Sequence, residues 1–144
     1  MSISRVLVVE DHREFSGQIR RILARCAAVQ VVGQAFNGLE AISKAEELRP
    51  DVVLLDIGLP KMNGLRVADY LRSIMPTARI AFVTQESSPD VIQQAFNSGG
   101  RAYVHKCRIQ LDLLCAIDAL LTGKQFVSRD LACGTLDSTF PLPV

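Results

Sequence analysis

The chain has 144 residues, of which 49% are hydrophobic and 22% are charged, and this length suits one domain with a full hydrophobic core. A formal net charge of +1 excludes the strong basic field of a protein that binds nucleic acid or acidic membranes through charge alone. No apolar run is long enough to cross a bilayer and the first residues do not form a signal peptide, so the sequence predicts a cytoplasmic protein with no membrane partner.

Short runs rich in β-branched residues alternate along the chain with segments of helical periodicity. The five runs are Arg5–Val9, Val29–Ala35, Val52–Leu55, Arg79–Thr84 and Arg101–His105. They are apolar almost throughout, which is typical of strands buried on both faces of a parallel sheet. Apolar residues with helical spacing follow the runs, at 15–23, 39–48, 65–74, 91–96 and 113–121. Five strand–helix units in series predict an α/β fold with helices on both faces of the sheet.

Glycine, proline and asparagine mark the expected helix boundaries. Asn37 and Gly38 are expected to open the second helix, which Arg49-Pro50 then ends. Gly99-Gly100 and Gly123 stand where helices end, a position that favours residues tolerant of a positive φ.

Polar residues stand at the carboxyl ends of four of the five predicted strands. They are Glu10 and Asp11, then Asp56, Thr84 and Lys106. The carboxyl ends of parallel strands lie at one edge of the sheet, where binding sites in this class of fold form. We therefore expect these side chains to meet in one pocket.

The residue types in this pocket indicate phosphoryl chemistry. Two like charges about 4 Å apart repel by roughly 4 kcal/mol at an effective dielectric near 20, so clustered carboxylates must take up protons or hold a cation. Carboxylate oxygens without cysteine or histidine select a hard ion, and an open octahedral site suits Mg²⁺. Lys106 and Thr84 on the opposite rim would bind the oxygens of a phosphoryl group, and Asp56 between the two sides is the best-placed nucleophile.

At these residues the chain resembles the receiver domain of bacterial two-component response regulators, over Ser4 to about Gly123. The motif residues are Glu10-Asp11, the D-x-x-x-P-x-x-x-G run of Asp56, Pro60 and Gly64, then Thr84, Tyr103 and Lys106. The stretches LLDIGLPKMNG and AIDALLTGKQFVS look most like receivers of the NarL/FixJ type, which usually precede a helix-turn-helix domain.

The resemblance implies a flavodoxin-like, doubly wound sheet of five parallel strands in the order 2-1-3-4-5, with five helices. It implies that Asp56 accepts a phosphoryl group from a sensor histidine kinase or a small donor. Mg²⁺ would be held by Glu10, Asp11, Asp56 and the backbone carbonyl of Gly58. A domain of this kind is a phosphoacceptor and not an enzyme.

The resemblance also assigns a switch. Thr84 and Lys106 would bind the phosphate oxygens, and Thr84 and Tyr103 would carry the change to the surface of the fourth helix, last strand and last helix. Thr84 is expected to move toward the phosphoryl group and Tyr103 to turn inward behind it. The expected output is transcription control, with homodimer formation on phosphorylation.

Two residues depart from the family pattern. Cys107 follows Lys106, where the family usually has proline across a cis bond, so the loop either carries a strained cis bond or is trans with Lys106 aimed differently. Gln85 stands where a small residue is usual. These departures keep a second function open, a receiver-like interaction module that does not need phosphorylation.

Residues 1–123 are expected to form the receiver domain and 124–144 a linker or tail. No helix-turn-helix fits in the tail, so DNA would be bound only through a domain that this chain lacks. Both a truncated regulator and a stand-alone receiver fit this expectation.

Other readings of the same residues are less favoured. A dinucleotide-binding enzyme would need a glycine-rich turn after the first strand, where VVEDHREF stands. A phosphatase of the haloacid dehalogenase kind would need a second acid at position 58, which is glycine. His12 is expected to point to solvent, and Asp112 and Asp118 are expected on the surface of the last helix.

Overall fold

The computed structural model describes residues 3–128, which form six strands and five α-helices. The strands are β1 (Ser4–Val9), β2 (Val29–Ala35), β3 (Val52–Leu55), β4 (Arg79–Thr84), β5 (Gly100–His105) and β6 (Phe126–Val127). The helices are α1 (Arg13–Leu23), α2 (Gly38–Leu48), α3 (Gly64–Ile74), α4 (Pro89–Asn97) and α5 (Ile109–Leu121), with a short 3₁₀ helix, η1 (Lys106–Arg108), before α5.

All the strand pairs of the sheet are parallel, and the strand order is β2-β1-β3-β4-β5-β6. The five predicted strands are confirmed to within one residue at each end, and so is their order. Val9 is in register with Leu55, and Leu55 with Phe82. Because neighbouring strands end at nearly the same level, the residues that follow them share one edge of the sheet.

The sheet contains one strand that the sequence did not predict. Strand β6 lies in the segment expected to be a linker, and it pairs with β5 through Ala102↔Phe126 and Tyr103↔Val127. The five predicted strands are thus present, and β6 adds a short sixth strand at the edge beside β5. A two-residue strand is too short to produce a hydrophobic period, so nothing in the sequence pattern marks it.

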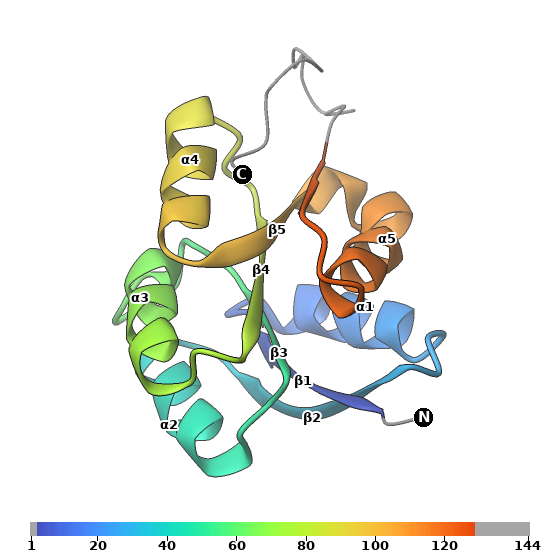
Figure 1. The fold of residues 1–144 in the computed structure, drawn as a ribbon, viewed down its shortest axis with the longest axis horizontal. Helices are drawn as coiled ribbons and strands as arrows, with labels where there is room; N and C mark the ends of the chain where they lie inside the picture. Colours follow the sequence, from blue (N-terminus) through green and yellow to red (C-terminus); the bar gives the residue numbers. More distant parts are fainter. Residues whose placement is uncertain (1–2, 129–144) are drawn as a thin grey trace.

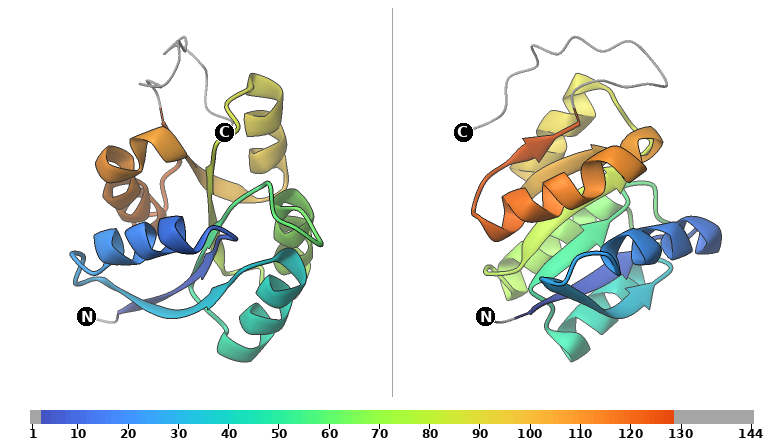
Figure 2. Two further views of the ribbon diagram at one scale, coloured as in Figure 1. Left: turned by 180° about the vertical axis from the view of Figure 1, so that it is seen from behind. Right: turned by 90° about the vertical axis from the view of Figure 1, so that its right-hand side faces the viewer.

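Helices α2, α3 and α4 cover one face of the sheet, and α1 and α5 cover the other (Figure 1; Figure 2). Successive strand side chains point to opposite faces. In β1, Val6 and Val8 pack with α1 and α5, whereas Leu7 and Val9 pack with α2, α3 and α4. All four side chains are buried, which explains why the strand is apolar along its whole length.

The expected helix boundaries are confirmed. The side chain of Asn37 accepts a hydrogen bond from the backbone N–H of Glu40 at 2.8 Å and so caps the start of α2. Gly99 and Gly123, after α4 and α5, have φ angles of 100° and 77°. Arg49 ends α2 in the left-handed region, with φ of 50°.

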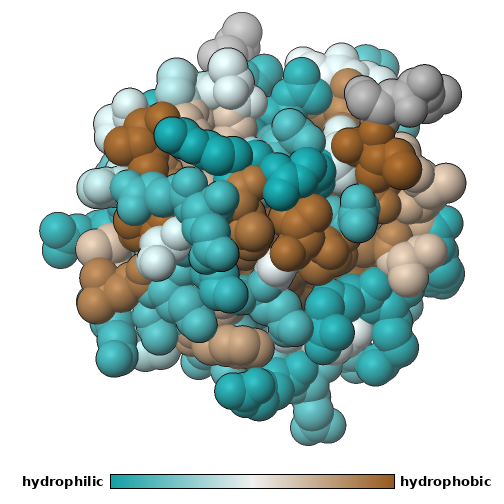
Figure 3. All heavy atoms as spheres, turned by 90° about the horizontal axis from the view of Figure 1, so that it is seen from below, coloured by the Kyte–Doolittle hydropathy of each residue, from teal (hydrophilic) through white to brown (hydrophobic). Residues whose placement is uncertain are grey.

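The lower face of the molecule in Figure 1 mixes polar and apolar side chains. Figure 3 shows this face from below, with apolar side chains interrupted by hydrophilic ones. Leu39, at the start of α2, is 53% exposed. Among residues 3–128 no helix combines the length and the hydropathy that a membrane span requires.

Candidate functional site

The predicted site residues meet at the carboxyl edge of the sheet. Glu10 and Asp11 follow β1, Asp56 follows β3, Thr84 ends β4 and Lys106 follows β5. A cavity of about 220 Å³ opens at this edge. It is lined by Asp11, His12, Asp56, Gly58, Thr84, Gln85, Glu86 and Lys106.

The three carboxylates form a cluster that is buried at one end and open at the other. Each of Glu10, Asp11 and Asp56 offers one oxygen, and these oxygens lie within 4.8 Å of one another. Glu10 is 1% exposed and Asp56 is 6% exposed, whereas Asp11 is exposed at the cavity. Burial therefore removes water from two of the three carboxylates, which makes a neighbouring positive charge more important.

Lys106 supplies a positive charge inside this cluster. Its Nζ atom lies 2.9 Å from Glu10 Oε1 and 3.0 Å from Asp56 Oδ2. The contact to Asp56 has hydrogen-bond geometry, but the approach to Glu10 Oε1 does not, so that second contact is mainly electrostatic. The ammonium also lies 4.8 Å from the centre of the Phe15 ring, within the range of a cation–π contact.

The ionisation of Glu10 and Lys106 reflects opposing effects. Burial raises the pKa of Glu10 above its ordinary value, even though Lys106 and the backbone N–H of His12 favour the charged form. Burial acts to lower the pKa of Lys106, but its contacts with Glu10 and Asp56 outweigh this and raise that pKa. The site therefore keeps Lys106 charged while Glu10 resists ionisation.

The donor set fits a hard divalent cation. Among the described residues, Glu10 Oε1 is the buried side-chain polar atom that lacks a hydrogen bond. Its polar neighbour is the Lys106 ammonium at 2.9 Å, so this oxygen retains lone pairs that a cation could use. Three carboxylates with an opening to solvent match the preference of Mg²⁺ for oxygen ligands and retained water.

Backbone contacts determine the shape of the loop after Asp56. The N–H of Gly58 donates to Asp56 Oδ1 at 3.3 Å, and the N–H of Gly64 donates to the Ile57 carbonyl at 2.8 Å. A Cβ atom on Gly64 would lie 2.1 Å from the Asp56 carbonyl oxygen, so no larger residue fits there. By contrast, a Cβ atom on Gly58 would have no atom within 4 Å.

Thr84 and Tyr103 both contact the backbone of Glu86, in the loop after β4. The Thr84 hydroxyl accepts a hydrogen bond from the Glu86 N–H at 3.4 Å, and the Tyr103 hydroxyl donates to the Glu86 carbonyl at 2.7 Å. Burial raises the pKa of Tyr103, and the charges of Glu86 and Asp56 raise it further. Tyr103 is only 1% exposed, so its ring already lies inside the protein and no inward turn from solvent is needed.

The loop after Lys106 is trans. Among residues 3–128 there is no cis peptide bond. Even so, Lys106 reaches Asp56, so the expectation that a trans loop aims the lysine elsewhere is wrong. Lys106 is the first residue of the 3₁₀ helix η1, which follows β5 directly.

A buried polar network that the sequence pattern did not predict lies beside the site. Asp112 was expected on the surface but is only 7% exposed. It accepts hydrogen bonds from Arg108 Nε at 2.9 Å and from the Ser128 hydroxyl at 2.8 Å. The spacing of Arg108 and Asp112, four residues apart at the start of a helix, is the one signal that indicated an ion pair. His12 and Asp118 are exposed, as predicted.

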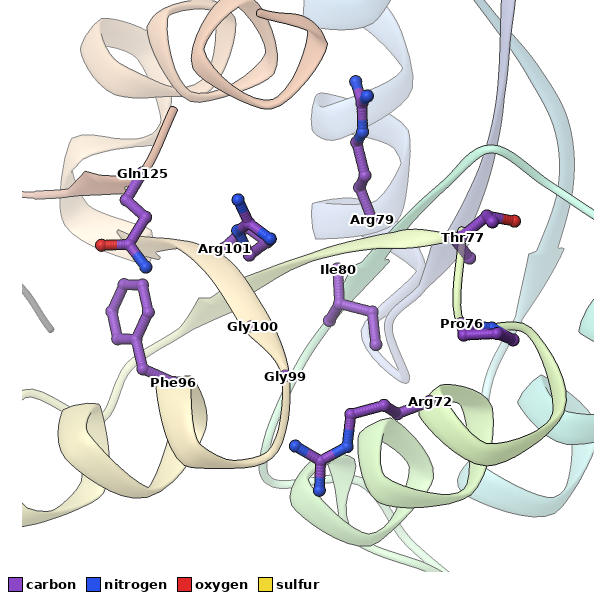
Figure 4. A pocket seen from close by; sticks show the side chains of 11 residues that line it. Arg72, Pro76, Thr77, Arg79, Ile80, Phe96, Gly99, Gly100, Arg101 and Gln125 are labelled. Carbon is purple, nitrogen blue, oxygen red and sulfur yellow. The ribbon is translucent and has the colours of Figure 1, made fainter. Parts of the chain in front are cut away.

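A larger cavity, of about 630 Å³, lies at the opposite end of the strands, beside the first residues of β4 and β5 (Figure 4). Three arginines line it, Arg72, Arg79 and Arg101. The guanidinium groups of Arg72 and Arg79 donate to the backbone carbonyls of Asn97 and Leu120, respectively, at 2.8 and 2.6 Å. Two of the three guanidinium groups therefore each hold a backbone carbonyl of a neighbouring segment, which is a structural role.

Comparisons with known proteins point to one family. The model of the response regulator receiver domain matches residues 6–118. The chain is 34% identical over 128 residues to the response regulator GacA of Pseudomonas viridiflava, covering 89% of this chain and 60% of that protein. It is 31% identical over 126 residues to the nitrate/nitrite response regulator NarL of Escherichia coli K12, covering 88% and 58%. The chain thus spans about three fifths of the length of these relatives.

Solved structures give the same picture. A LuxR-family two-component response regulator from Aurantimonas sp. SI85-9A1 superposes with a TM-score of 0.85 at 31% identity, over 92% of this chain and 94% of that one. The receiver domain of NarL from Mycobacterium tuberculosis superposes with a TM-score of 0.81 at 29% identity, over 86% and 100%. The flavodoxin-like fold predicted from the sequence is confirmed.

Proposed function

Because this chain belongs to the response regulator receiver domain family, we propose that it accepts a phosphoryl group on Asp56 with Mg²⁺ bound. One observation supports this most strongly. The Asp56 carboxylate lines a cavity, with the Glu10 and Asp11 carboxylates within 4.8 Å and the Lys106 ammonium at 3.0 Å. A nucleophile between a cation site and an ammonium is the arrangement that phosphoryl transfer needs.

In the proposed reaction an oxygen of the Asp56 carboxylate forms a bond to phosphorus. The bond from phosphorus to the donor breaks, and its electron pair leaves with the donor's histidine nitrogen or acetate oxygen. Nothing is oxidised or reduced. Lys106 stabilises charge on the phosphoryl oxygens, and the Thr84 hydroxyl donates to one of them. Glu10, Asp11, Asp56 and the Gly58 carbonyl would hold Mg²⁺, which offsets the negative charge that gathers there.

Signalling would follow from the new charge. Phosphorylation would replace the single negative charge of the Asp56 carboxylate with the roughly −1.5 to −2 charge of a phosphoryl group, and it would bring three acceptor oxygens beside Thr84. The Thr84 hydroxyl can donate to phosphate while it still accepts from the Glu86 N–H, so a shift of Thr84 toward the phosphate would act on the backbone of Glu86, which Tyr103 also holds through its carbonyl. The loop after β4 would move, and the surface formed by α4, β5 and α5 would change with it.

The partners of this chain follow from the same proposal. A sensor histidine kinase would supply the phosphoryl group, and the protein would act as an acceptor and not as an enzyme. GacA and NarL are response regulators longer than this chain, so control of transcription would require an output domain with a helix-turn-helix. Formation of a homodimer would accompany phosphorylation.

The test is a change in intact mass after incubation with acetyl phosphate, with and without Mg²⁺. We expect the mass of one phosphoryl group to be added to the wild type only with Mg²⁺. Asp56→Asn should take none, and Asp118→Asn, which changes an exposed aspartate on α5, should behave as the wild type.

A second function is supported by two departures from the family pattern, Gln85, which lines the cavity, and Cys107, which follows Lys106 in the chain. In this alternative the chain is an interaction module that keeps the receiver fold without accepting phosphate. Absence of any added mass, with every donor and divalent ion tried, would support this alternative over the first proposal.

A further inference from the structure

Strand β6 is bonded to the part of β5 that leads into Lys106. The backbone N–H of Ser128 donates to the Tyr103 carbonyl at 2.8 Å, and the backbone N–H of His105 donates to the Ser128 hydroxyl at 3.0 Å. Val127 pairs with Tyr103 and is buried in the same apolar cluster. The end of β6 therefore touches the residue immediately before Lys106.

The Ser128 hydroxyl joins this backbone to a buried carboxylate. Ser128 is 2% exposed, and its hydroxyl accepts from the His105 N–H while it donates to Asp112 Oδ2 at 2.8 Å. Asp112 in turn accepts from the guanidinium of Arg108 at 2.9 and 3.4 Å. The network therefore forms hydrogen bonds to the chain on both sides of Lys106, at His105 and at Arg108.

The backbone between these two points is short and tightly turned. The His105 Nδ1 atom accepts a hydrogen bond from the Cys107 N–H at 3.1 Å, which caps the 3₁₀ helix η1. Lys106 is the first residue of η1, and its side chain extends from there to Glu10 and Asp56. The ammonium is held at its far end by Asp56 and Glu10, and the position of η1 decides how the flexible four-carbon side chain must extend to keep both contacts.

We propose that Ser128 and Asp112 are positioning residues for Lys106, and that the docking of β6 on β5 is thereby coupled to the carboxylate site. Ser128 holds the His105 N–H, Asp112 holds Ser128 and Arg108, and together they fix η1. The consequence for phosphorylation rests on the function proposed above, whereas the placement of the Lys106 ammonium does not.

The coupling acts in both directions, as any linkage between two sites must. Phosphate bound between Lys106 and Thr84 would contact Lys106, the first residue of η1, and β6 restrains the same short helix. If phosphorylation favours one position of η1, it changes the equilibrium constant for docking of β6 by some factor. Docking of β6 then changes the equilibrium constant for phosphorylation by the same factor. Strand β6 is the last described element, so this linkage carries a signal from the acidic pocket to the point where the chain continues past residue 128.

The first test measures the surroundings of the Lys106 ammonium through the methylene group that carries it. The Lys106 ε-methylene signals are followed by NMR in the unphosphorylated protein, assigned by their loss in Lys106→Met. We expect Ser128→Ala to shift these signals and to speed hydrogen exchange of the His105 amide by about tenfold, the loss of one hydrogen bond. Thr122→Ala, which removes an exposed hydroxyl bonded to the Asp118 carbonyl, is the matched control and should change neither.

A conservative variant distinguishes the effect of losing the Ser128 hydroxyl group from the effect of altered side-chain packing. Ser128→Thr keeps the hydroxyl and should restore both readouts to nearly wild-type values. An equal disturbance by alanine and threonine would assign the effect to packing and overturn the proposal. Unchanged Lys106 signals in a folded Ser128→Ala protein would overturn it as well. If Ser128→Ala does not fold, Asp112→Asn takes its place under the same criteria.

The second test measures acetyl phosphate labelling of Asp56 in the same variants. We expect about tenfold slower labelling in Ser128→Ala at saturating Mg²⁺, with normal labelling in Ser128→Thr and Thr122→Ala. If the wild type takes no label, the proposed phosphoacceptance fails, and the positioning role is then judged from the Lys106 signals alone. If labelling is normal in a folded Ser128→Ala, the coupling to phosphorylation is wrong.

Discussion

The ammonium of Lys106 lies 3.0 Å from Asp56 Oδ2, although 50 residues separate the two in sequence and a cysteine follows the lysine. The same ammonium lies 2.9 Å from Glu10 Oε1. One cation is therefore shared by two carboxylates, of which Glu10 is 1% exposed and Asp56 is 6% exposed. This sharing makes the site sensitive to the loss of any member and to the arrival of a metal ion.

Replacing Lys106 with methionine should destabilise the metal-free protein at pH 7. The side chain of Lys106 is 12% exposed, and its removal leaves two buried carboxylates without their cation. We expect a loss of about 3 kcal/mol in the free energy of unfolding. Urea denaturation measures it, and added Mg²⁺ should restore part of the loss. A free energy equal to that of the wild type would contradict the shared ion pair.

Stability in metal-free buffer should fall as the pH rises through the titration of Glu10. The pKa of Glu10 in the folded protein is raised above its ordinary 4.5, so between these two values the folded chain binds more protons than the unfolded chain. The free energy of unfolding then decreases with increasing pH, and the loss is complete above the raised value. Urea denaturation of wild type and Glu10→Gln at pH 5 and pH 7 checks this. The decrease should be smaller in the variant, and an identical pH dependence would contradict it.

Asp11 should matter for metal binding and hardly at all for folding. Its side chain is exposed at the cavity, whereas Glu10 and Asp56 are held by Lys106. We expect Asp11→Asn to change metal-free stability by less than about 0.5 kcal/mol. Mg²⁺ at about ten times its dissociation constant should add about 1.4 kcal/mol to the wild type, and the variant should lose most of that gain. Thermal unfolding with and without Mg²⁺ measures both, and an equal gain in both proteins would exclude Asp11 as a ligand.

Leu55 and Asp56, neighbours in sequence, should respond to alanine with opposite signs. Leu55 is fully buried at the end of β3, so Leu55→Ala opens a cavity and should cost about 3 kcal/mol. Asp56→Ala should stabilise the metal-free protein, because it relieves crowding among carboxylates and leaves Lys106 paired with Glu10. Chemical denaturation of both variants without metal provides the comparison. Similar destabilisation by both would mean that the carboxylates do not strain the fold.

The sequence predicted those parts of the fold that depend on local pattern. Continuous apolar runs identified the five long strands, and the residues after them identified the pocket because parallel strands end together. Contacts between distant segments could not be predicted in this way. Ser128 and Asp112 are 16 residues apart, and the burial of Asp112 follows from the docking of β6, which has no sequence period. Helical spacing alone therefore placed Asp112 on the surface, which was wrong.

The trans bond after Lys106 shows a second limit of sequence reasoning. The absence of proline after Lys106 indicated that the loop differs from the family pattern. A pattern of residue types does not predict the direction in which the Lys106 side chain points. The direction comes from η1, which begins at Lys106 and is capped by the ring of His105.

The loop after Asp56 has a consequence for how this protein can diversify. Its course depends on main-chain bonds and on Gly64, which leaves no room for a side chain, whereas the surroundings of Gly58 are empty. A library of side chains at position 58 can therefore be introduced beside the Asp56 carboxylate without disturbing the scaffold. If Asp56 is phosphorylated as proposed, side chains at position 58 would tune the access of water to the phosphoryl group while folding is left unchanged.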